Sequence, residues 1–163
     1  MLNMDKKDLD KTVLERLVRQ IIEEQIGGTK KEEVVDFIRD KDILSGVTSI
    51  KLPTVKVDQS NKLDTGNITD EVYTKDLFTL EESPRLGCGI MEMRETTFDW
   101  TLNYDEIDYV IEGHLDIIVD GRKISADTGE LILIPKGTKI KFSVPNYARF
   151  IYVTYPADWA SQK

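Results

Sequence analysis

Three carboxylates, Asp105, Glu106 and Asp108, stand at the front of an apolar stretch, DEIDYVIEGHLDIIVDG, residues 105–121. Residues two apart on a strand point to the same face, so Glu106 and Asp108 are expected to lie side by side. If that face is buried, at least one carboxyl group must be paired with a cation or must hold a proton. A protonated acid beside an ionised one can act as acid and base, so Glu106 and Asp108 are candidate catalytic residues.

A second interpretation of Asp108 is open at this stage. Asp108 lies near the start of the expected strand, where a carboxylate can be solvated. It can also be paired with one of three cations of the same region, Arg94, Lys136 or Lys139. In either case the pair has no acid–base role.

Composition excludes several classes of function. The chain has 163 residues, which is enough for one domain with a sizeable core. Its net charge is −8 and no basic patch stands out, so we expect no nucleic-acid partner. No apolar run is long enough to span a membrane. The single cysteine, Cys88, cannot form an internal disulfide, which fits a reducing, cytoplasmic setting, and we expect it to be a small buried residue.

The strand pattern that must position the carboxylates begins near residue 73. Short β-like runs bounded by Gly, Pro, Asn or Asp follow one another: IMEMRE, EIDYVIEG, HLDIIVDG, RKISA, ELILIP, IKFSV and RFIYVTY. Asp120-Gly121 between two of these runs is a hairpin signal. The spacing predicts an all-β sandwich or barrel over residues 73–163.

The chain before residue 73 has a different character. Residues 8–26 have helical periodicity and end at Gly27-Gly28. A second short helix is expected from Thr29, where a capping box precedes Val34, Val35, Phe37 and Ile38. Residues 1–44 are therefore predicted as a helical segment. Residues 45–72 are rich in turn formers and are predicted as an extended linker or arm.

Two spacings in the β region resemble the motifs of the cupin family, a jelly-roll barrel. Six residues separate Glu106 from Gly113, and five separate Gly129 from Pro135-Lys136-Gly137. In cupins, three histidines and one glutamate of these motifs bind a divalent metal. In this chain the two histidine positions of the first motif hold Trp100 and Leu102, or Asp99 and Thr101 with the longer spacing. The histidine position of the second motif holds Ile140, so only Glu106 matches a metal ligand.

The resemblance therefore implies a barrel that has kept its pocket and lost its metal ligands, and we expect no metal site. In this register Trp100, Leu102, Asn103, Tyr104 and Ile140 are the predicted pocket residues beside Glu106 and Asp108. The only histidine, His114, follows the Gly113 turn and is expected to face outward.

A narrower resemblance covers residues 73–160. The segments FDWTLNYDEIDYVIEG, ELILIPKGTKIKF and RFIYVTYPADW resemble the C-terminal domain of the EutQ family of ethanolamine-utilisation proteins. This implies a cytoplasmic bacterial protein associated with a bacterial microcompartment. It also implies an ATP-dependent acetate kinase activity, which makes acetyl phosphate from acetate.

The kinase hypothesis requires phosphate contacts. The chain has no GxxxxGK[ST] loop, so Lys136 and Lys139, near the second motif, are the candidate phosphate-binding residues. Mg-ATP is the only cofactor implied, and none is expected to be tightly bound. The alternative is a non-catalytic module that binds a small ligand or assists assembly. A third hypothesis, a metal-dependent cupin, lacks its ligand set.

Partners are expected at two surfaces. The apolar side of the N-terminal helix resembles microcompartment-targeting helices, so shell or cargo proteins are its expected partners. Packing on its own barrel or on a second copy is the alternative. Apolar residues on both faces of DYVIEG and FIYVTY fit a homodimer that pairs through its sheets.

Overall fold

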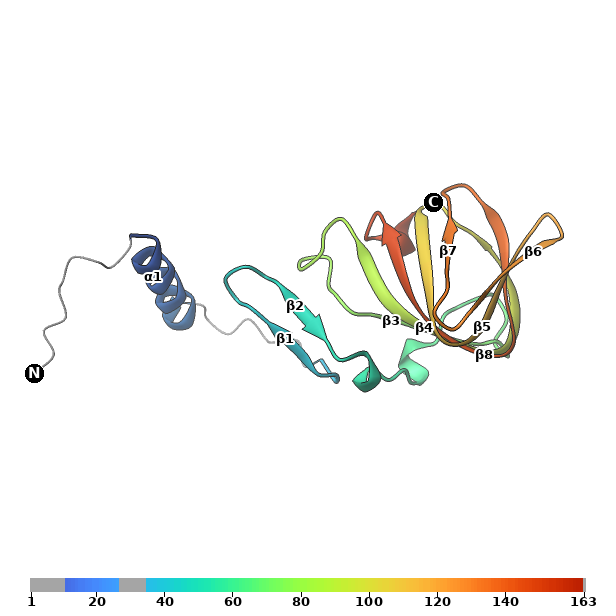
Figure 1. The fold of residues 1–163 in the computed structure, drawn as a ribbon, viewed down its shortest axis with the longest axis horizontal. Helices are drawn as coiled ribbons and strands as arrows, with labels where there is room; N and C mark the ends of the chain where they lie inside the picture. The colour runs from blue at the N-terminus through green and yellow to red at the C-terminus, as the bar shows by residue number, and fades with distance from the viewer. Residues whose placement is uncertain (1–10, 27–34, 163) are drawn as a thin grey trace, which may run out of the picture. The chain divides into compact units, whose positions relative to one another are not determined.

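The computed structural model describes residues 11–26 and 35–162. The chain divides into two compact units between Lys56 and Val57, and we describe each by itself (Figure 1). Within the described residues, no helix has the length and apolar character that crossing a membrane requires.

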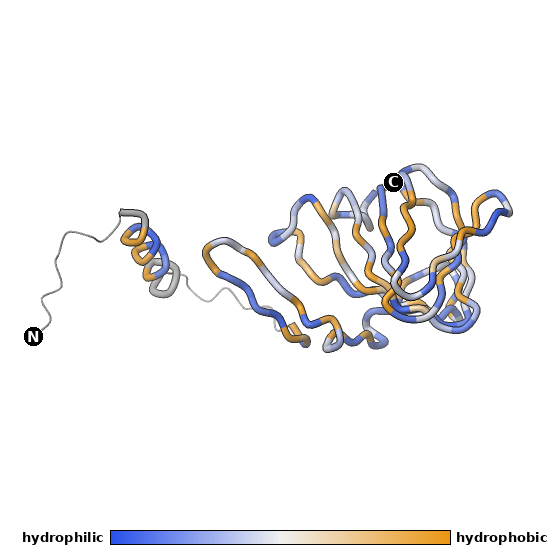
Figure 2. The backbone as a smooth tube through the Cα atoms, in the orientation of Figure 1, coloured by the Kyte–Doolittle hydropathy of each residue, from blue (hydrophilic) through white to orange (hydrophobic). Residues whose placement is uncertain are grey.

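The first unit contains a helix and a small hairpin. Helix α1 spans Lys11–Ile26, which confirms the predicted helix over the described part of residues 8–26. Five of its apolar side chains are between 44% and 55% exposed: Val13, Leu14, Leu17, Val18 and Ile21. Strands β1 (Arg39–Lys41) and β2 (Thr48–Ile50) pair antiparallel and are followed by the 3₁₀ turn η1 (Leu52–Thr54). Figure 2 shows orange and blue residues on different sides of α1.

The second predicted helix is wrong where it can be compared. Its first residues lie outside the described part of the chain, and residues 35–38 form a bend that leads into β1. The Ile38 N–H donates to Thr54 Oγ1 at 2.9 Å, and the Ile38 carbonyl accepts from the Lys51 N–H at 2.9 Å. The backbone groups that a helix would use are therefore bonded to the segment after β2.

The segment predicted as an extended linker, residues 45–72, contains regular structure. It includes β2, η1 and a second 3₁₀ turn, η2 (Gln59–Asn61), before β3 begins at Glu71. Asp58 caps η2 by accepting from the Ser60 N–H at 2.7 Å. The turn formers of this segment therefore take part in short hydrogen-bonded turns.

The second unit is an antiparallel β-barrel, which confirms the all-β prediction. Its strands are β3 (Glu71–Asp76), β4 (Gly87–Thr101), β5 (Asp105–Val119), β6 (Arg122–Asp127), β7 (Leu131–Ile134) and β8 (Lys139–Tyr155). The sheet order is β3-β4-β8-β5-β6, and β7 pairs with the first part of β5. The 3₁₀ turn η3 (Trp159–Ser161) follows β8. The predicted hairpin at Asp120-Gly121 connects β5 to β6, and both residues have positive φ, 49° and 78°.

The three long strands bend so that the sheet closes. The register of β4 against β8 shifts between Arg94 and Thr96, where Glu95 has a φ of 42°. The β5 strand bends at Gly113, where a Cβ would lie 2.0 Å from the Tyr147 carbonyl oxygen. Burial alternates along β5 from Asp105 to Val110, with Glu106, Asp108 and Val110 inside. The core of the barrel includes Leu115, Ile117, Phe142, Val144 and Phe150.

Candidate functional site

The candidate site is built on the buried pair that opened the sequence argument. Glu106 is 4% exposed and Asp108 is fully buried. Both lie in the part of β5 that pairs with β7 on one side and β8 on the other, so backbone pairing fixes their positions. By distance and angle, Glu106 Oε1 and both carboxyl oxygens of Asp108 have no hydrogen-bond partner, and neither does Thr154 Oγ1, across from Glu106 on β8. The two carboxyl groups are nevertheless close enough for a side-chain hydrogen bond between them to influence the pKa of each.

Burial controls the ionisation of this pair. It raises the pKa of Glu106 to about 8. Burial, together with the nearby charge of Glu106, raises the pKa of Asp108 well above its usual range. Burial therefore favours the protonated form of both side chains, and the hydrogen bond between them favours the proton on Asp108.

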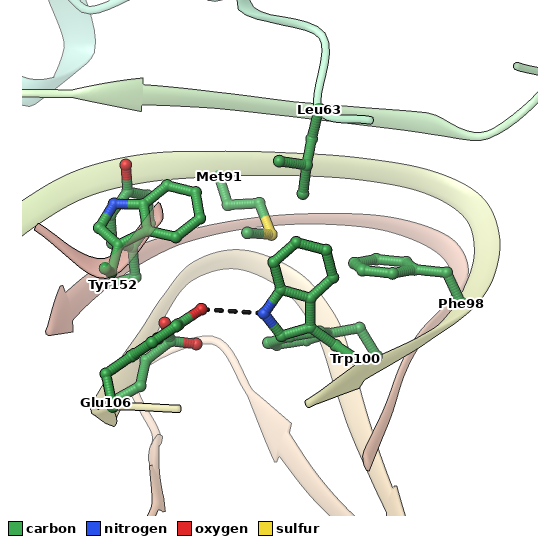
Figure 3. Close-up of a pocket in the computed structure, with 9 residues that line it drawn as sticks. Leu63, Met91, Phe98, Trp100, Glu106 and Tyr152 are labelled. Carbon is green, nitrogen blue, oxygen red and sulfur yellow. Dashed lines mark hydrogen bonds between the residues drawn. The ribbon is translucent and has the colours of Figure 1, made fainter. Parts of the chain in front are cut away.

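Aromatic and apolar side chains surround Glu106 and form a pocket. Its lining residues are Leu63, Met91, Phe98, Trp100, Tyr104, Glu106, Phe142, Tyr152 and Trp159. Leu63 and Met91 lie on one side and Glu106 on the other, with Trp100 beside Phe98 (Figure 3). The space between the side chains, including the solvent at the mouth, is about 270 Å³. As a cavity volume the pocket has about 10 Å³, room for about one water molecule.

Two hydrogen bonds involve the turn between β4 and β5. The Trp100 indole N–H donates to the Tyr104 hydroxyl at 2.9 Å (the dashed line in Figure 3). The Asn103 amide donates to the Gln162 carbonyl at 3.4 Å, so the segment after β8 is tied to the β4–β5 turn. Asn103 thus lies beside the pocket wall.

The structure brings together only part of the predicted pocket. Trp100, Tyr104 and Glu106 line it, and Asp108 lies next to Glu106 on the same inner face of β5. Leu102 and Ile140 are buried in the core and are not among the residues that line this pocket. The second interpretation of Asp108 is wrong, because this side chain is neither solvated nor paired with Arg94, Lys136 or Lys139.

The two candidate phosphate-binding lysines lie elsewhere. Lys139 and Lys141 alternate with the buried Ile140 and Phe142, so their side chains leave the outer face of β8. Lys141 pairs with Asp99 at 2.6 Å. Lys136 is exposed in the turn before β8, where its N–H donates to Asp105 Oδ1 at 2.9 Å. The structure does not bring these lysines to the pocket.

Six residues that line the pocket are not among the predicted pocket residues: Leu63, Met91, Phe98, Phe142, Tyr152 and Trp159. The sequence contained one indication of the position of Tyr152: Gly89, which pairs with it from β4. A Cβ at position 89 would lie 2.1 Å from the Tyr152 hydroxyl, so only glycine leaves room for this phenol. The hydroxyl donates to Asp76 Oδ1 at 2.6 Å. Trp159 contacts Tyr104 and Tyr152 from η3, with ring centroids 5.9 and 6.0 Å apart.

Metal ligation was tested on the same residues. Among the described residues, no group of three or more His, Cys, Asp or Glu side chains is placed to hold a metal ion. His114 is committed elsewhere: its Nδ1 lies 2.6 Å from Asp127 Oδ1, and its Nε2 lies 3.0 Å from Asp116 Oδ1. Cys88 is partly buried, and burial raises the pKa of its thiol.

Comparison with known proteins agrees with this architecture. Residues 9–161 match the family described as Ethanolamine utilisation protein EutQ, so the match reaches well before residue 73, where the sequence resemblance began. The protein named Acetate kinase EutQ from Clostridioides difficile (strain 630) is 77% identical over 159 residues, which cover 98% of this chain and 99% of that protein.

Solved structures give the same result. The structure of the Clostridium difficile EutQ protein is 81% identical with a TM-score of 0.77, and the match covers 79% of this chain and 93% of that one. The Schizosaccharomyces pombe Cnp3 cupin domain is 14% identical with a TM-score of 0.54 over 75% of this chain and 88% of that one, which supports the cupin jelly roll. The chain therefore belongs to the EutQ family of ethanolamine utilisation proteins and has a cupin fold.

Proposed function

We propose that this chain is an acetate kinase of ethanolamine utilisation and that Glu106 and Asp108 form its acetate site. The observation that carries the proposal is the 77% identity, over almost the whole of both chains, to a protein named Acetate kinase EutQ. In the reaction, an acetate oxygen bonds to the γ-phosphorus of ATP. The bond from that phosphorus to the bridging oxygen breaks, and ADP leaves with the electron pair.

The pocket supports the acetate half of this reaction. Its walls are apolar side chains such as Met91 and Phe98, which suit a methyl group. Glu106 provides the only carboxyl group among its lining residues, and Asp108 lies beside it on the inner face of β5. A buried acid pair in an apolar pocket orients a small polar group and excludes bulk water from it.

Mg-ATP does not fit the same pocket. Phosphoryl transfer requires cations around the phosphates, and within the described part of the chain no lysine or arginine lines this pocket. The enclosed space of about 10 Å³ is far below the several hundred Å³ typical of drug-sized ligands. We therefore assign only the acetate half of the reaction to this pocket, with Glu106, backed by Asp108, as its proposed binding group. The lining side chains must move apart to admit acetate, because the cavity has room for about one water molecule.

An assay of acetyl phosphate formation from acetate and Mg-ATP tests the kinase. The matched pair of variants is Glu106→Leu, inside the pocket, and Glu112→Leu, on an exposed part of the same strand. Activity in the wild type and in Glu112→Leu, with loss of at least a hundredfold in Glu106→Leu, supports the proposal. Equal activity in all three proteins places the reaction outside the barrel pocket and overturns the assignment of Glu106.

The second candidate function is a non-catalytic module that binds a small ligand. The absence of a cation among the residues of the pocket favours it. In this case acetate binds to the folded protein, but no phosphoryl transfer is detected in the same assay.

Two further proposals concern location and assembly. We propose that α1 carries the protein into a bacterial microcompartment of the cytoplasm by placing its apolar side against a shell or cargo protein. The exposure of Val13, Leu17 and Ile21 supports this docking role. We also propose a homodimer that pairs through the sheets of the barrel. The sequence pointed to β5 and β8 for this interface; the exposed apolar side chains of β5 and β7 now favour the outer face of those two strands.

A further inference from the structure

The pocket is closed, so part of its wall must move before a ligand can reach Glu106. Its cavity has room for about one water molecule. Most of the lining side chains are buried, and they come from β4, β5 and β8 or from Tyr104 in the β4–β5 turn. The lining residues that are partly exposed are Leu63, Trp100 and Trp159. These three side chains therefore form the mouth of the pocket.

Two residues of the mouth are held by the barrel. Trp100 lies on β4, where it pairs with Ile140 of β8, and its indole N–H donates to Tyr104 at 2.9 Å (Figure 3). The Leu63 N–H donates to the Val72 carbonyl at 2.9 Å, which ties the segment before β3 to that strand. Displacing either residue from the mouth would break hydrogen bonds of ordinary length.

The third residue, Trp159, is held more weakly. It lies on η3, a single 3₁₀ turn outside the sheet, and no side chain caps the start of this turn. The Trp159 indole N–H donates to Asp76 Oδ1 at 3.5 Å, and the Asn103 amide donates to the Gln162 carbonyl at 3.4 Å. Both distances are at the long limit for hydrogen bonds, so η3 is the part of the mouth that costs least to displace.

The turn η3 is also built to move as one body. The Asp158 carbonyl accepts from Ser161 Oγ at 3.3 Å and from the Gln162 side-chain amide at 2.9 Å, so the turn is bonded within itself. The residue before it, Ala157, is buried against β4, because a Cβ at Gly87 would lie 3.0 Å from the Ala157 carbonyl oxygen. The boundary between fixed and movable chain therefore falls at Asp158.

We propose that Trp159 is the gate of the barrel pocket and that η3 rotates away about Asp158 to admit the ligand to Glu106. The indole packs on Tyr104 and Tyr152, with ring centroids 5.9 and 6.0 Å apart, so its departure uncovers both rings and the pocket beneath. The inference rests on the proposed function for the identity of the ligand as acetate, whereas the gate rests on the geometry of the mouth. A closed gate excludes bulk water from the site between binding events.

A gate and a fixed wall predict opposite effects of truncation. Opening a gate costs free energy and lowers the apparent affinity for the ligand, so a variant without the gate ring binds more tightly. Trp159→Ala should therefore bind acetate about threefold or more tighter than the wild type. Trp100→Ala makes the same truncation at the fixed part of the mouth and should bind acetate more weakly. NMR titration of ¹³C-labelled acetate into the full chain without nucleotide measures both affinities, and the protein spectrum verifies the fold of each variant.

Motion of the gate can be measured without any ligand. The chain has two tryptophans, so fluorotryptophan labelling gives two ¹⁹F resonances, one for each mouth tryptophan. Relaxation dispersion and saturation transfer should detect a second, solvent-exposed state of Trp159 and none of Trp100. Asn103→Cys with Gln162→Cys, in a Cys88→Ser background, places a disulfide where the two segments meet. The oxidised form should lose the second state and weaken acetate binding about tenfold or more, and reduction should restore both.

The outcomes separate the gate from the proposed function. A Trp159 resonance with no second state, weaker acetate binding by Trp159→Ala, or equal acetate binding by the oxidised and reduced disulfide variant would each overturn the gate. A second state of Trp159 that the disulfide abolishes, with no acetate bound by the wild type, would keep the gate and refute acetate as its ligand. Acetyl phosphate formation by a protein whose Trp159 has no second state would do the opposite.

Discussion

The indole N–H of Trp100 donates to the hydroxyl of Tyr104 at 2.9 Å, across the turn that joins β4 to β5. Both rings belong to the wall of the pocket, and the chain's other tryptophan, Trp159, lines it as well. Tryptophan fluorescence of this protein therefore reports on the pocket.

Tyr104→Phe should remove one hydrogen bond from the pocket wall and leave the aromatic ring in place. The substitution removes the acceptor of the Trp100 N–H, and one hydrogen bond contributes about 1 kcal/mol to stability. We expect the free energy of unfolding to fall by up to about 1 kcal/mol and the Trp100 emission to shift to longer wavelength in a Trp159→Phe background. Tyr109→Phe, on the outer face of β5, is the control and should change neither.

Stability should decrease between about pH 4.5 and pH 8 because of the buried acids. Burial raises the folded-state pKa of Glu106 to about 8, so the folded protein holds a proton that the unfolded chain releases near its ordinary pKa. The stabilisation is complete below the unfolded pKa and is lost as the pH rises through the folded one, at about 1.4 kcal/mol per pH unit for each proton. Urea unfolding at several pH values measures this slope.

The double variant Glu106→Gln/Asp108→Asn supplies the comparison. It has no acid to titrate at these positions, so its stability should change less between pH 5 and pH 8 than that of the wild type. Parallel curves for the two proteins would show that the pair is not protonated in the folded state.

His114 should titrate above its ordinary range. Its hydrogen bonds to Asp127 and Asp116 favour the imidazolium and raise its pKa, although burial acts in the opposite direction. These hydrogen bonds stabilise the folded protein fully at pH values below the pKa that His114 has in the unfolded chain. This stabilisation is lost as the pH rises through the higher pKa that His114 has in the folded protein. Because the His114 ring is partly exposed and Asp127 is exposed, solvent screens this interaction, and we expect it to contribute less than about 1 kcal/mol to stability.

The chain has one histidine, so its ring protons give an unambiguous NMR titration. Asp127→Asn should lower the pKa of His114. An ordinary value for His114 in the wild type would contradict the geometry of the pair.

The outer face of the barrel should form a dimer interface. Leu131 and Leu133 of β7 are 62% and 61% exposed, and they pair with Tyr109 and Ile107 of β5. Leu133→Lys places a charge in this apolar patch and should produce a monomer in light scattering. Ile124→Lys makes the same apolar-to-lysine change at an exposed residue of β6. It should leave the molar mass of the dimer unchanged. A monomeric wild type at high concentration would rule out the interface.

Recruitment should depend on the apolar side of α1. Leu17→Asp with Ile21→Asp interrupts the exposed row, and Arg19→Asp changes charge on the same helix as a control. We expect the double variant to lose co-purification with microcompartments while keeping acetate binding. Equal recovery of all three proteins would exclude docking through this row.

Alternation made the inner face of β5 predictable. Glu106 and Asp108 were placed on the same face because side chains alternate strictly along a strand, and the structure shows that this face is buried. The hairpin at Asp120-Gly121 was predictable for a similarly local reason, since both positions require positive φ.

Residues that reach the pocket from far along the chain were not predictable in this way. Leu63 and Trp159 come from irregular segments before β3 and after β8, and no periodicity marks their direction. The lysines near the second motif were assigned to the site by closeness in sequence, whereas alternation along β8 directs Lys139 outward. The bend at residues 35–38 shows the same limit, because its partner lies beyond β2.

The order of the strands also determines when the barrel can form during synthesis. Gly87, at the start of β4, pairs with Thr154 near the end of β8, so β4 lacks one neighbour until nearly every strand has left the ribosome. Pairings between such distant residues slow folding to roughly milliseconds or seconds. Throughout that interval the apolar side of β4 is accessible to other nascent chains, and the yield of native protein should depend on how quickly translation supplies β8.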